Sequence, residues 1–423
     1  MASRSIPPIR HSIDKRVRVP ASKSVANREL ILSALAEGRS RVDLGPEDPG
    51  DDVLAMRAAI GALGCGVDGA ATGTLTVTGL GRSAPTIDAR IDAGDAGTVA
   101  RFTTSLAATL PGRTRIDGSP RLRERPMAPL IRALRELGAG IDAEALPLTV
   151  TGPLRGGYVD VPGSASSQFA SALLLAAPRS RQGLTLRISG SLVSAPFVAM
   201  TIAGLERRGV HVERLAPNEF RIAPQPVKAR DVAIPGDATA ASYPAAAAAV
   251  LGGRVTVENV DPRPSAGDQG DVRCFEVLRA MGCDVSTLSG GVSVRRTGAL
   301  YGIRDDLRDI SDTFPTIAAV AACATGPSEL LGLGHTRRQE SDRIAAVAAG
   351  LRALGGDVTE YADGIRIVPA PLHGGVVAAA GDHRIAMAFS ILGLAVPGVT
   401  IEGAEVTAKT YPGFYGLLEE LAS

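Results

Sequence analysis

Tryptophan is absent from this chain of 423 residues, and aromatic residues make up only 3% of it. The core is therefore expected to consist of aliphatic and small side chains, which agrees with the 49 glycines and the hydrophobic share of 45%. An excess of charge of one sign is also absent, because 45 Lys and Arg stand against 44 Asp and Glu. This balance excludes the large net positive charge that attracts nucleic acid or an anionic membrane, so any anion site must be local.

Long hydrophobic runs, cysteine clusters and metal motifs are missing as well. The longest apolar stretch, residues 385–396, is shorter than the roughly 20 residues that span a bilayer. The segment MASRSIPPIRHSIDKR has no apolar secretion signal, so a cytoplasmic protein is expected. Four scattered cysteines indicate buried thiols, and neither H-E-x-x-H nor G-x-x-x-x-G-K-[ST] occurs. Membrane proteins, disulfide scaffolds, zinc proteases and P-loop enzymes are thereby excluded.

An internal repeat of about seventy residues runs through the chain. Its mark is a helix end followed by glycine and a β-branched residue, at Gly64, Gly138, Gly209, Gly282 and Gly355, which lie 74, 71, 73 and 73 residues apart. Each glycine is expected to end a helix in the left-handed conformation before a strand begins. The pattern predicts six units of the form βαβαββ, the last of which is truncated after its second helix.

A second pattern, in step with the first, predicts one buried helix in each unit. Small or capping residues open almost wholly apolar stretches, which are PASKSVANRELILSALAEG, DAGDAGTVARFTTSLAATLPG, PGSASSQFASALLLAAP, PGDATAASYPAAAAAVLGG, DISDTFPTIAAVAACATG and AGDHRIAMAFSILGLAVPG. Helices that are apolar all round are buried. We therefore expect an α/β fold of two domains, each with three helices enclosed by sheet. The proline-rich stretch 215–237 is the predicted boundary, and the strand around Val17 to Val19 is expected to pair with the truncated unit.

Unusual polar residues gather where these buried helices begin. They are Lys23, Ser24, Arg28, Asp95, Gly97, Thr98, Arg101, Ser166, Ser167, Gln168, Asp237, Ser242, Asp312, Asp382, His383 and Arg384. Helix N-termini present free N–H groups and a partial positive charge, so several together predict a receptor for phosphates or carboxylates. Ordinary capping explains the Ser, Thr and Asp residues equally well. It does not explain cations in first turns, where they oppose the helix dipole.

The second helices add two charged clusters, at residues 124–126 and 339–343, and a lysine follows at position 409. Each cluster alone is typical of a solvated helix face. Their equivalent positions in the repeat favour a shared site instead.

The motifs PASKSVANR, DAGDAGTVARF, PRLRERP, GSASSQF, GDATAASY, ESDRIAAV, GDHRIAMAFS and TAKTYPGF, in this order, resemble the 5-enolpyruvylshikimate-3-phosphate synthase family. The resemblance implies a two-domain enolpyruvyl transferase fold of six βαβαββ repeats, three per domain, with the active site in the cleft between domains. Residues 20–234 would form the N-terminal domain on the shikimate 3-phosphate side. Residues 1–19 and 235–423 would form the C-terminal domain.

The resemblance also implies a reaction. The enolpyruvyl group of phosphoenolpyruvate is transferred to the 5-hydroxyl of shikimate 3-phosphate through a tetrahedral intermediate, and phosphate is released. This step belongs to aromatic amino acid biosynthesis through chorismate, and glyphosate inhibits it. The resemblance implies two small-molecule substrates, a monomer, no cofactor and no metal, because cations hold the charged groups while acids and bases move protons.

The motifs assign the site residues by position. Asp312 would be the base at the 5-hydroxyl, and Glu340 would be the acid at C3 of phosphoenolpyruvate, with Lys23 assisting. Shikimate 3-phosphate would be bound by Lys23, Ser24, Arg28, Ser166, Ser167, Gln168, Ser194, Asp312 and Gln339. Phosphoenolpyruvate would be bound by Lys23, Gly97, Arg125, Gln168, Arg343, Arg384 and Lys409.

Four positions depart from the usual pattern of the family. Asp95 stands where Asn is common, His335 where Asn is common, Gln339 where Lys is common, and Phe197 where Tyr is common. Affinity for the phosphate would then rest more on Arg28 and the serines, or on the nearby Arg337 and Arg338.

Two alternative functions stay open at this point. A UDP-N-acetylglucosamine enolpyruvyl transferase shares the fold and the donor, but it uses a mobile loop that bears a cysteine, and the corresponding stretch RLRERPMAPL has none. A non-catalytic repeat protein with anion-binding pockets is the other alternative. Anion binding alone gives no reason to place Asp312 and Glu340 among cations.

Overall fold

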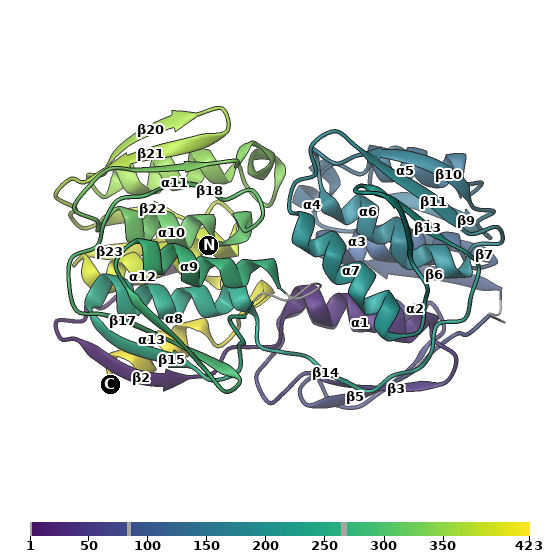
Figure 1. The fold of residues 1–423 in the computed structure, drawn as a ribbon, viewed down its shortest axis with the longest axis horizontal. Coiled ribbons are helices and arrows are strands. Elements are labelled where there is room, and N and C mark those ends of the chain that lie inside the picture. Colours follow the sequence, from purple (N-terminus) through teal and green to yellow (C-terminus); the bar gives the residue numbers. More distant parts are fainter. Residues whose placement is uncertain (1, 83–85, 264–268) are drawn as a thin grey trace. The chain divides into compact units, whose positions relative to one another are not determined.

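The computed structural model of the chain describes residues 2–82, 86–263 and 269–423. These residues form two compact units. The N-terminal unit is Ala21–Ile234, and the C-terminal unit consists of residues 2–20, 235–263 and 269–423. The chain therefore passes from one unit to the other after residue 20 and again after residue 234 (Figure 1).

The described residues of the N-terminal unit form three four-stranded sheets. Its elements are α1 (Lys23–Leu35), β3 (Arg39–Asp43), α2 (Asp51–Ala62), β4 (Gly66–Asp68), β5 (Thr74–Thr78), β6 (Ile87–Asp92), α3 (Gly97–Ala108), β7 (Gly112–Asp117), α4 (Pro120–Glu124), α5 (Ala128–Glu136), β8 (Gly140–Ile141), β9 (Leu148–Gly152), β10 (Gly157–Pro162), α6 (Ser167–Ala176), η1 (Ala177–Arg179), β11 (Leu184–Ser189), α7 (Ala195–Arg207), β12 (Glu213–Ala216), β13 (Glu219–Ile222) and β14 (Val232–Ala233).

The described residues of the C-terminal unit form two four-stranded sheets and one sheet of three strands. Its elements are β1 (Ser3–Ser5), β2 (Ile13–Val17), α8 (Ala238–Leu251), β15 (Gly253–Val257), η2 (Gly270–Arg273), α9 (Cys274–Ala280), β16 (Asp284–Leu288), β17 (Gly291–Arg296), β18 (Arg304–Asp306), η3 (Ser311–Thr313), α10 (Phe314–Ala321), β19 (Ser328–Leu331), η4 (Gly334–Arg338), α11 (Arg343–Ala353), β20 (Asp357–Tyr361), β21 (Gly364–Val368), β22 (Gly375–Ala378), α12 (His383–Ala395), β23 (Val399–Glu402), η5 (Ala404–Lys409) and α13 (Phe414–Ala422).

One strand pattern recurs in the sheets, and it confirms the predicted βαβαββ repeat. In the sheet β6-β7-β9-β8, β6 and β7 are parallel neighbours joined through α3, and Ile91 lies opposite Ile116. The hairpin of β8 and β9 then adds antiparallel to β7. A parallel pair needs a crossover connection, whereas a hairpin needs only a turn, so in each four-stranded sheet of the described residues the strands of the repeat lie in the order first, second, fourth, third.

The N-terminal strands do not pair as the sequence predicted. The strand that ends at Val17, β2, lies parallel to β15 in the fourth repeat, and not in the sixth. It is β1 that pairs antiparallel with β23 and occupies the place of the missing hairpin in the truncated sixth repeat. The opening strand of the first repeat is β14, which is parallel to β3. The division between the two units, after Ile234, falls inside the predicted boundary stretch 215–237, which also contains β13 and β14.

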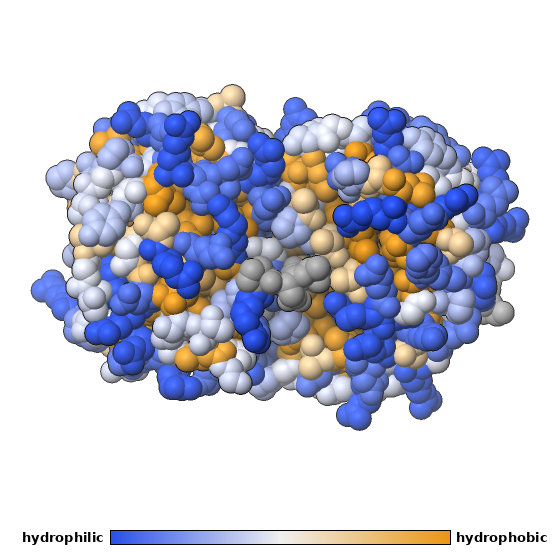
Figure 2. Space-filling view, in the orientation of Figure 1, coloured by the Kyte–Doolittle hydropathy of each residue, from blue (hydrophilic) through white to orange (hydrophobic). Residues whose placement is uncertain are grey.

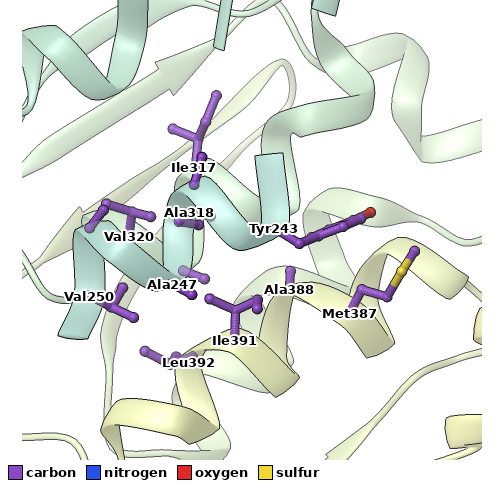
Figure 3. Packing of buried hydrophobic residues seen from close by; sticks show 14 of the residues in the cluster. Tyr243, Ala247, Val250, Ile317, Ala318, Val320, Met387, Ala388, Ile391 and Leu392 are labelled. Atoms are coloured by element: carbon purple, nitrogen blue, oxygen red, sulfur yellow. The ribbon is translucent and has the colours of Figure 1, made fainter. Parts of the chain in front are cut away.

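Six buried helices form the two cores, as their apolar sequences predicted. In α3 every residue is buried, and in α8 every residue from Ala238 to Val250 is buried. Figure 3 shows how α8, α10 and α12 pack, with Ala247, Ala318 and Ala388 among larger aliphatic side chains. Small residues let the helix backbones approach closely, which explains a core with few aromatic residues.

The glycines that mark the repeat have the predicted conformation. Gly64, Gly138, Gly209, Gly282 and Gly355 all have φ between 79° and 101°. A side chain there would strain the backbone, so glycine is required where each second helix turns into the following hairpin.

Hydrophilic residues are spread over the face drawn in Figure 2, with apolar patches between them. The exposed large apolar residues of the described chain are scattered, namely Tyr158, Leu215, Leu288, Tyr301, Tyr361 and Val376. No helix in the described residues is both long and apolar enough to cross a membrane.

Candidate active site

A buried arginine organises the polar centre of the C-terminal unit. Arg343 is the first residue of α11, and its side chain is only 1% exposed. It donates from Nε to Asp382 Oδ2 (2.8 Å), from Nη1 to Asp312 Oδ1 (2.8 Å) and Gln339 Oε1 (2.5 Å), and from Nη2 to Glu340 Oε2 (2.9 Å). One guanidinium therefore fixes the positions of both predicted catalytic carboxylates.

Two more cations complete this centre. Arg384 Nη2, on α12, donates to Asp312 Oδ2 at 2.6 Å, and Lys409 Nζ, at the end of η5, donates to Glu340 Oε1 at 3.0 Å. Asp312 is thus bound by two guanidinium groups, and Glu340 by one guanidinium and one ammonium group. The two carboxylates share Arg343 as a common partner.

The arginines of this centre remain charged despite their burial. Burial works to lower the pKa of Arg343, but Asp382, Glu340 and Asp312 outweigh it and hold the pKa above its ordinary value. The same balance holds for Arg384, where burial is again opposed, chiefly by Asp312. Two fixed positive charges in a low-dielectric region are suited to binding an anion.

Helix capping places these groups. Asp382 is the N-cap of α12, and its Oδ1 accepts from the backbone N–H of Arg384 at 3.0 Å. Its other oxygen accepts from Arg343 and from Ser341 Oγ (3.0 Å). The capping interpretation was therefore correct but incomplete, because Asp382 also pairs with a buried cation from another repeat. Sequence reasoning missed this pair, since Asp before a helix is typical of a cap.

The N-terminal unit carries a second cluster, where α1, α2 and α3 begin. Lys23 is the first residue of α1, and its Nζ lies 3.4 Å from Asp52 Oδ2 on α2. Asn27 Nδ2 donates to Thr98 Oγ1 at 2.8 Å and so connects α1 to α3. Asp52 was not singled out from the sequence, because an acid in a first helical turn is common on electrostatic grounds alone.

Arg28 turns inward and connects α1 to α7. It is 3% exposed and donates to Thr201 Oγ1 (2.8 Å), to the Ser24 carbonyl (2.8 Å) and to the Phe197 carbonyl (3.1 Å). Its guanidinium lies 5.2 Å from the Phe102 ring centroid. Burial lowers the pKa of Arg28 to about 9. These contacts fix the first turn of α1, which carries the predicted substrate ligands.

Gly97 lies beside two arginines. Arg125 is a predicted phosphoenolpyruvate ligand, and Arg101 belongs to the same helix as Gly97. Arg101 Nη1 donates to Gln168 Oε1 at 2.7 Å, and Arg125 Nη1 donates to the Asp95 carbonyl at 3.3 Å. A Cβ atom at Gly97 would overlap Arg101 Nη1 and would lie 2.9 Å from Arg125 Nη2. The missing side chain is therefore what allows the two guanidinium groups to lie beside the first turn of α3.

The predicted serine ligands lie at two helix starts. Ser166 is the N-cap of α6, where its Oγ accepts from the backbone N–H of Gln168 at 3.2 Å, and Ser167 is the first residue of that helix. Ser194 precedes α7 in the left-handed conformation, with φ of 53°. A non-glycine residue in this conformation is uncommon, so the local backbone is held by its surroundings.

The positions that depart from the family pattern have their own contacts. Asp95 accepts a short hydrogen bond from Ser119 Oγ. His335 Nε2 lies 2.9 Å from Ser311 Oγ, and burial lowers the pKa of His335. Arg337 donates to both carboxylate oxygens of Asp342, at 3.0 and 2.8 Å. Asp342 is the N-cap residue of α11, so Arg337 pairs with the start of that helix.

The four cysteines form no disulfide among the described residues. Cys65, Cys274 and Cys283 are buried and reduced, as predicted, while Cys323 is partly buried. In residues 2–82, 86–263 and 269–423, no three His, Cys, Asp or Glu side chains are grouped to hold a metal ion.

The structure thus brings the predicted residues together in two groups, one in each unit. In the C-terminal unit they are Asp312, Gln339, Glu340, Arg343, Arg384 and Lys409. In the N-terminal unit Ser24 and Arg28 contact each other, Gly97 lies beside Arg125, and Lys23 pairs with Asp52.

Solved structures share this fold over nearly the whole chain. The EPSP synthase of Acinetobacter baumannii has a TM-score of 0.82 and 28% identity, and covers 99% of this chain and 98% of its own. The enolpyruvyl transferase NikO of Streptomyces tendae has a TM-score of 0.73 at 19% identity, over 97% of this chain and 94% of its own. The fold is that of the enolpyruvyl transferases.

Sequence comparison narrows this class to one family. The family model of EPSP synthase (3-phosphoshikimate 1-carboxyvinyltransferase) matches residues 8–418, and the chain belongs to this family. A 3-phosphoshikimate 1-carboxyvinyltransferase of Methanoculleus marisnigri is 39% identical over 412 residues, 96% of each chain. One of Methanosphaerula palustris is 40% identical over 413 residues, again 96% of each, and one of Trichormus variabilis is 37% identical over 418 residues, 97% of each.

Proposed function

We propose that this protein transfers the enolpyruvyl group of phosphoenolpyruvate to the 5-hydroxyl of shikimate 3-phosphate, which makes it a 3-phosphoshikimate 1-carboxyvinyltransferase of the shikimate pathway. The full-length membership of the family supports this activity. The observation that carries the proposal is the pair Asp312 and Glu340, each held by two cations in the C-terminal unit. A protein that only bound anions would gain nothing from carboxylates in these places.

Phosphoenolpyruvate is proposed to bind to the cations of both units. Its carboxylate and phosphate groups suit Arg343, Arg384 and Lys409, together with Lys23 and Arg125. Gly97 and Gln168 would complete this set. Arginine offers two parallel N–H groups to either anion, and burial of the guanidinium groups strengthens each contact.

Shikimate 3-phosphate is proposed to bind on the side of the N-terminal unit. The hydroxyls of Ser166 and Ser167 and the N-terminus of α6 suit its phosphate group. Lys23, Ser24, Arg28, Gln168 and Ser194 would hold the rest of the molecule, with Asp312 and Gln339 from the other unit. Because the internal contacts of Arg28 already use much of its guanidinium, we assign to it chiefly the placement of Ser24.

The chemical steps follow from these positions. Asp312 accepts the proton of the 5-hydroxyl as the oxygen attacks C2 of phosphoenolpyruvate, and Glu340 delivers a proton to C3, assisted by Lys23. The tetrahedral intermediate then returns a proton from C3 to the Glu340 carboxylate while the bond from C2 to the phosphate oxygen breaks and phosphate leaves. Arg343 and Lys409, which both contact Glu340, are also the proposed ligands of the phosphoenolpyruvate anion.

The direct test is to incubate the protein with both substrates and to measure phosphate release without added metal. We expect turnover that requires shikimate 3-phosphate. Turnover on UDP-N-acetylglucosamine in its place, with none on shikimate 3-phosphate, would overturn the proposal. The missing cysteine in RLRERPMAPL and the family match both speak against that outcome.

Replacing Gly97 with alanine is expected to weaken the binding of both phosphoenolpyruvate and glyphosate. The new Cβ would displace Arg101 and Arg125, and a shift of this size at a binding site reduces kcat/KM by roughly ten- to a hundredfold. The KM for phosphoenolpyruvate and the inhibition constant of glyphosate measure the effect. Gly61→Ala is the matched control, because Gly61 lies in α2 with no atom within 4 Å of the added Cβ. Equal constants for the two variants would show that Gly97 lies outside the site.

We further propose that the protein is a monomer that works in the cytoplasm. The small number of exposed large apolar side chains in the described residues supports a monomer, since permanent interfaces between subunits are usually rich in such residues. Light scattering should give the mass of one chain, 43.3 kDa, and a dimer mass would refute the monomer.

A further inference from the structure

Asp271 is a buried carboxylate that the proposed mechanism does not use. It lies in the turn η2 and is 4% exposed. Its Oδ2 accepts from Thr239 Oγ1, on the first turn of α8, at 2.5 Å. Its Oδ1 is buried, and no donor among the described residues reaches it. A charged carboxylate with one unsatisfied buried oxygen is costly, whereas a proton on that oxygen removes the charge.

The polar groups that act on Asp271 include two carboxylates and one cation. The turn η2 packs against α8, α9 and η3. The polar groups are Thr239 of α8, Asp237 at the N-cap of α8, Asp312 of η3, Cys274 of α9 and Arg384 of α12. On the turn itself, Arg273 pairs with Asp305. The neighbours of Asp271 therefore include two further carboxylates and the predicted phosphoenolpyruvate ligand Arg384.

These neighbours act on the proton affinity of Asp271 in both directions. Burial raises the pKa of Asp271 most, and Asp312 and Asp237 raise it further, while the Thr239 hydrogen bond and Arg384 lower it, with a result of about 7. The pKa of the Cys274 thiol is raised well above its usual value, mainly by burial, so this thiol remains neutral. Asp271 is thus the acid of this group that is poised to change its charge near neutral pH.

An anion that binds to Arg384 changes this balance. Asp312 keeps its second guanidinium partner, Arg343, at 2.8 Å, whereas Asp271 has only the Thr239 hydroxyl among the described residues. Added negative charge next to Arg384 disfavours charged carboxylates nearby. We propose that Asp271 is a proton-uptake site, which takes one proton from solvent onto Oδ1 when a phosphate or carboxylate of the substrate binds Arg384. The same proton returns to solvent when the product leaves.

This inference rests on the proposed function and predicts a pH dependence of substrate affinity. When Asp271 is already protonated, binding needs no proton. Above its pKa in the free protein each binding event must take one up, so the KM for phosphoenolpyruvate rises with pH, by at most about tenfold per pH unit. Asp271→Asn is neutral at every pH and still accepts from Thr239. Its KM is expected to keep the low-pH value across the neutral range.

Two further variants separate this role from a structural one. Asp284→Asn, at an exposed position of β16, is the matched control and should keep the pH dependence of the unmodified protein. Thr239→Val removes a hydrogen bond that lowers the pKa of Asp271, so the rise in KM should move to higher pH. A purely structural role would lower the thermal midpoint without moving the pH profile. If Asp271→Asn fails to fold, the pH dependence of KM in Thr239→Val decides whether Asp271 takes up the proton.

Calorimetry tests the proton itself. Titration with phosphoenolpyruvate in two buffers of different ionisation enthalpy should show uptake of up to one proton near neutral pH in the unmodified protein and none in Asp271→Asn. Equal uptake, or equal KM profiles, in Asp271→Asn and Asp284→Asn would overturn the inference. Absence of phosphate release in the unmodified protein at every pH would instead refute the proposed function, and the calorimetric comparison would still decide the role of Asp271.

Discussion

Replacing Arg343 with methionine is expected to lower the free energy of unfolding by about 3–5 kcal/mol and to abolish turnover. Methionine fills a similar volume, but it leaves Asp312, Glu340 and Asp382 close together without their shared cation. Asp312 keeps Arg384 and Glu340 keeps Lys409, but the buried Asp382 loses the guanidinium that pairs with it, and such a loss is costly. Denaturant unfolding measures the first effect, and phosphate release measures the second.

The control for this prediction lies on the same helix. Arg352, near the end of α11, pairs with Glu360 at 2.9 Å, and its side chain is 47% exposed. Arg352→Met should cost less than about 1 kcal/mol, since water already screens such a pair. If the two variants lost similar stability, the buried cluster would not have the energetic weight assigned to it.

Asp312→Asn is expected to reduce kcat by roughly 10²- to 10⁴-fold while the protein stays folded. The amide keeps the shape of the carboxylate, and its single oxygen can still accept from either Arg343 or Arg384, but it cannot take the proton of the 5-hydroxyl. Single-turnover phosphate release measures the chemical step. Calorimetric binding of shikimate 3-phosphate checks that the site still forms.

Asp305→Asn is the matched control for the charge change. Asp305 lies in β18, close in sequence to Asp312, and pairs with Arg273 at 2.5 Å, away from the arginines of the site. Its kcat should remain within about twofold of the unmodified value, as for most substitutions away from a site. A similar loss in both variants would remove Asp312 from the role of base.

The architecture of each repeat was predictable because it depends on short-range patterns. The glycine after each second helix, such as Gly282, follows from the left-handed turn that ends a helix. The apolar stretch that became α8 has no polar face, so burial was its one stable arrangement. Both signals lie within one window of sequence, which is why they could be recognised without a structure.

The pairing of strands between distant segments was not predictable in the same way. The sequence indicated a strand around Val17 to Val19, and the structure has β2 over Ile13–Val17, parallel to β15, while β1 pairs with β23. Periodicity gives the face that a strand buries and carries no information on which sheet it joins. The prediction therefore chose the wrong partner for β2.

Some residues of the site could likewise be predicted from the sequence, and others could not. Motif resemblance indicated Arg343, Arg384, Asp312 and Glu340, and the structure places them in contact. The partners outside those motifs, Asp52 and Asp271, were missed. Each is an ordinary acid in a helical turn by its local sequence, and only packing between distant segments makes it a partner of a buried polar group.

The pairing of β1 and β2 with strands far along the chain also affects the order in which the two units can fold. Ser5 and Val17 precede the N-terminal unit along the chain, whereas their partners Thr400 and Val257 follow it. During synthesis β1 and β2 therefore cannot pair with these partners until the whole N-terminal unit has been produced. Closing such long loops is slow, so we expect the C-terminal unit to complete its folding last, when β1 and β2 pair with β23 and β15.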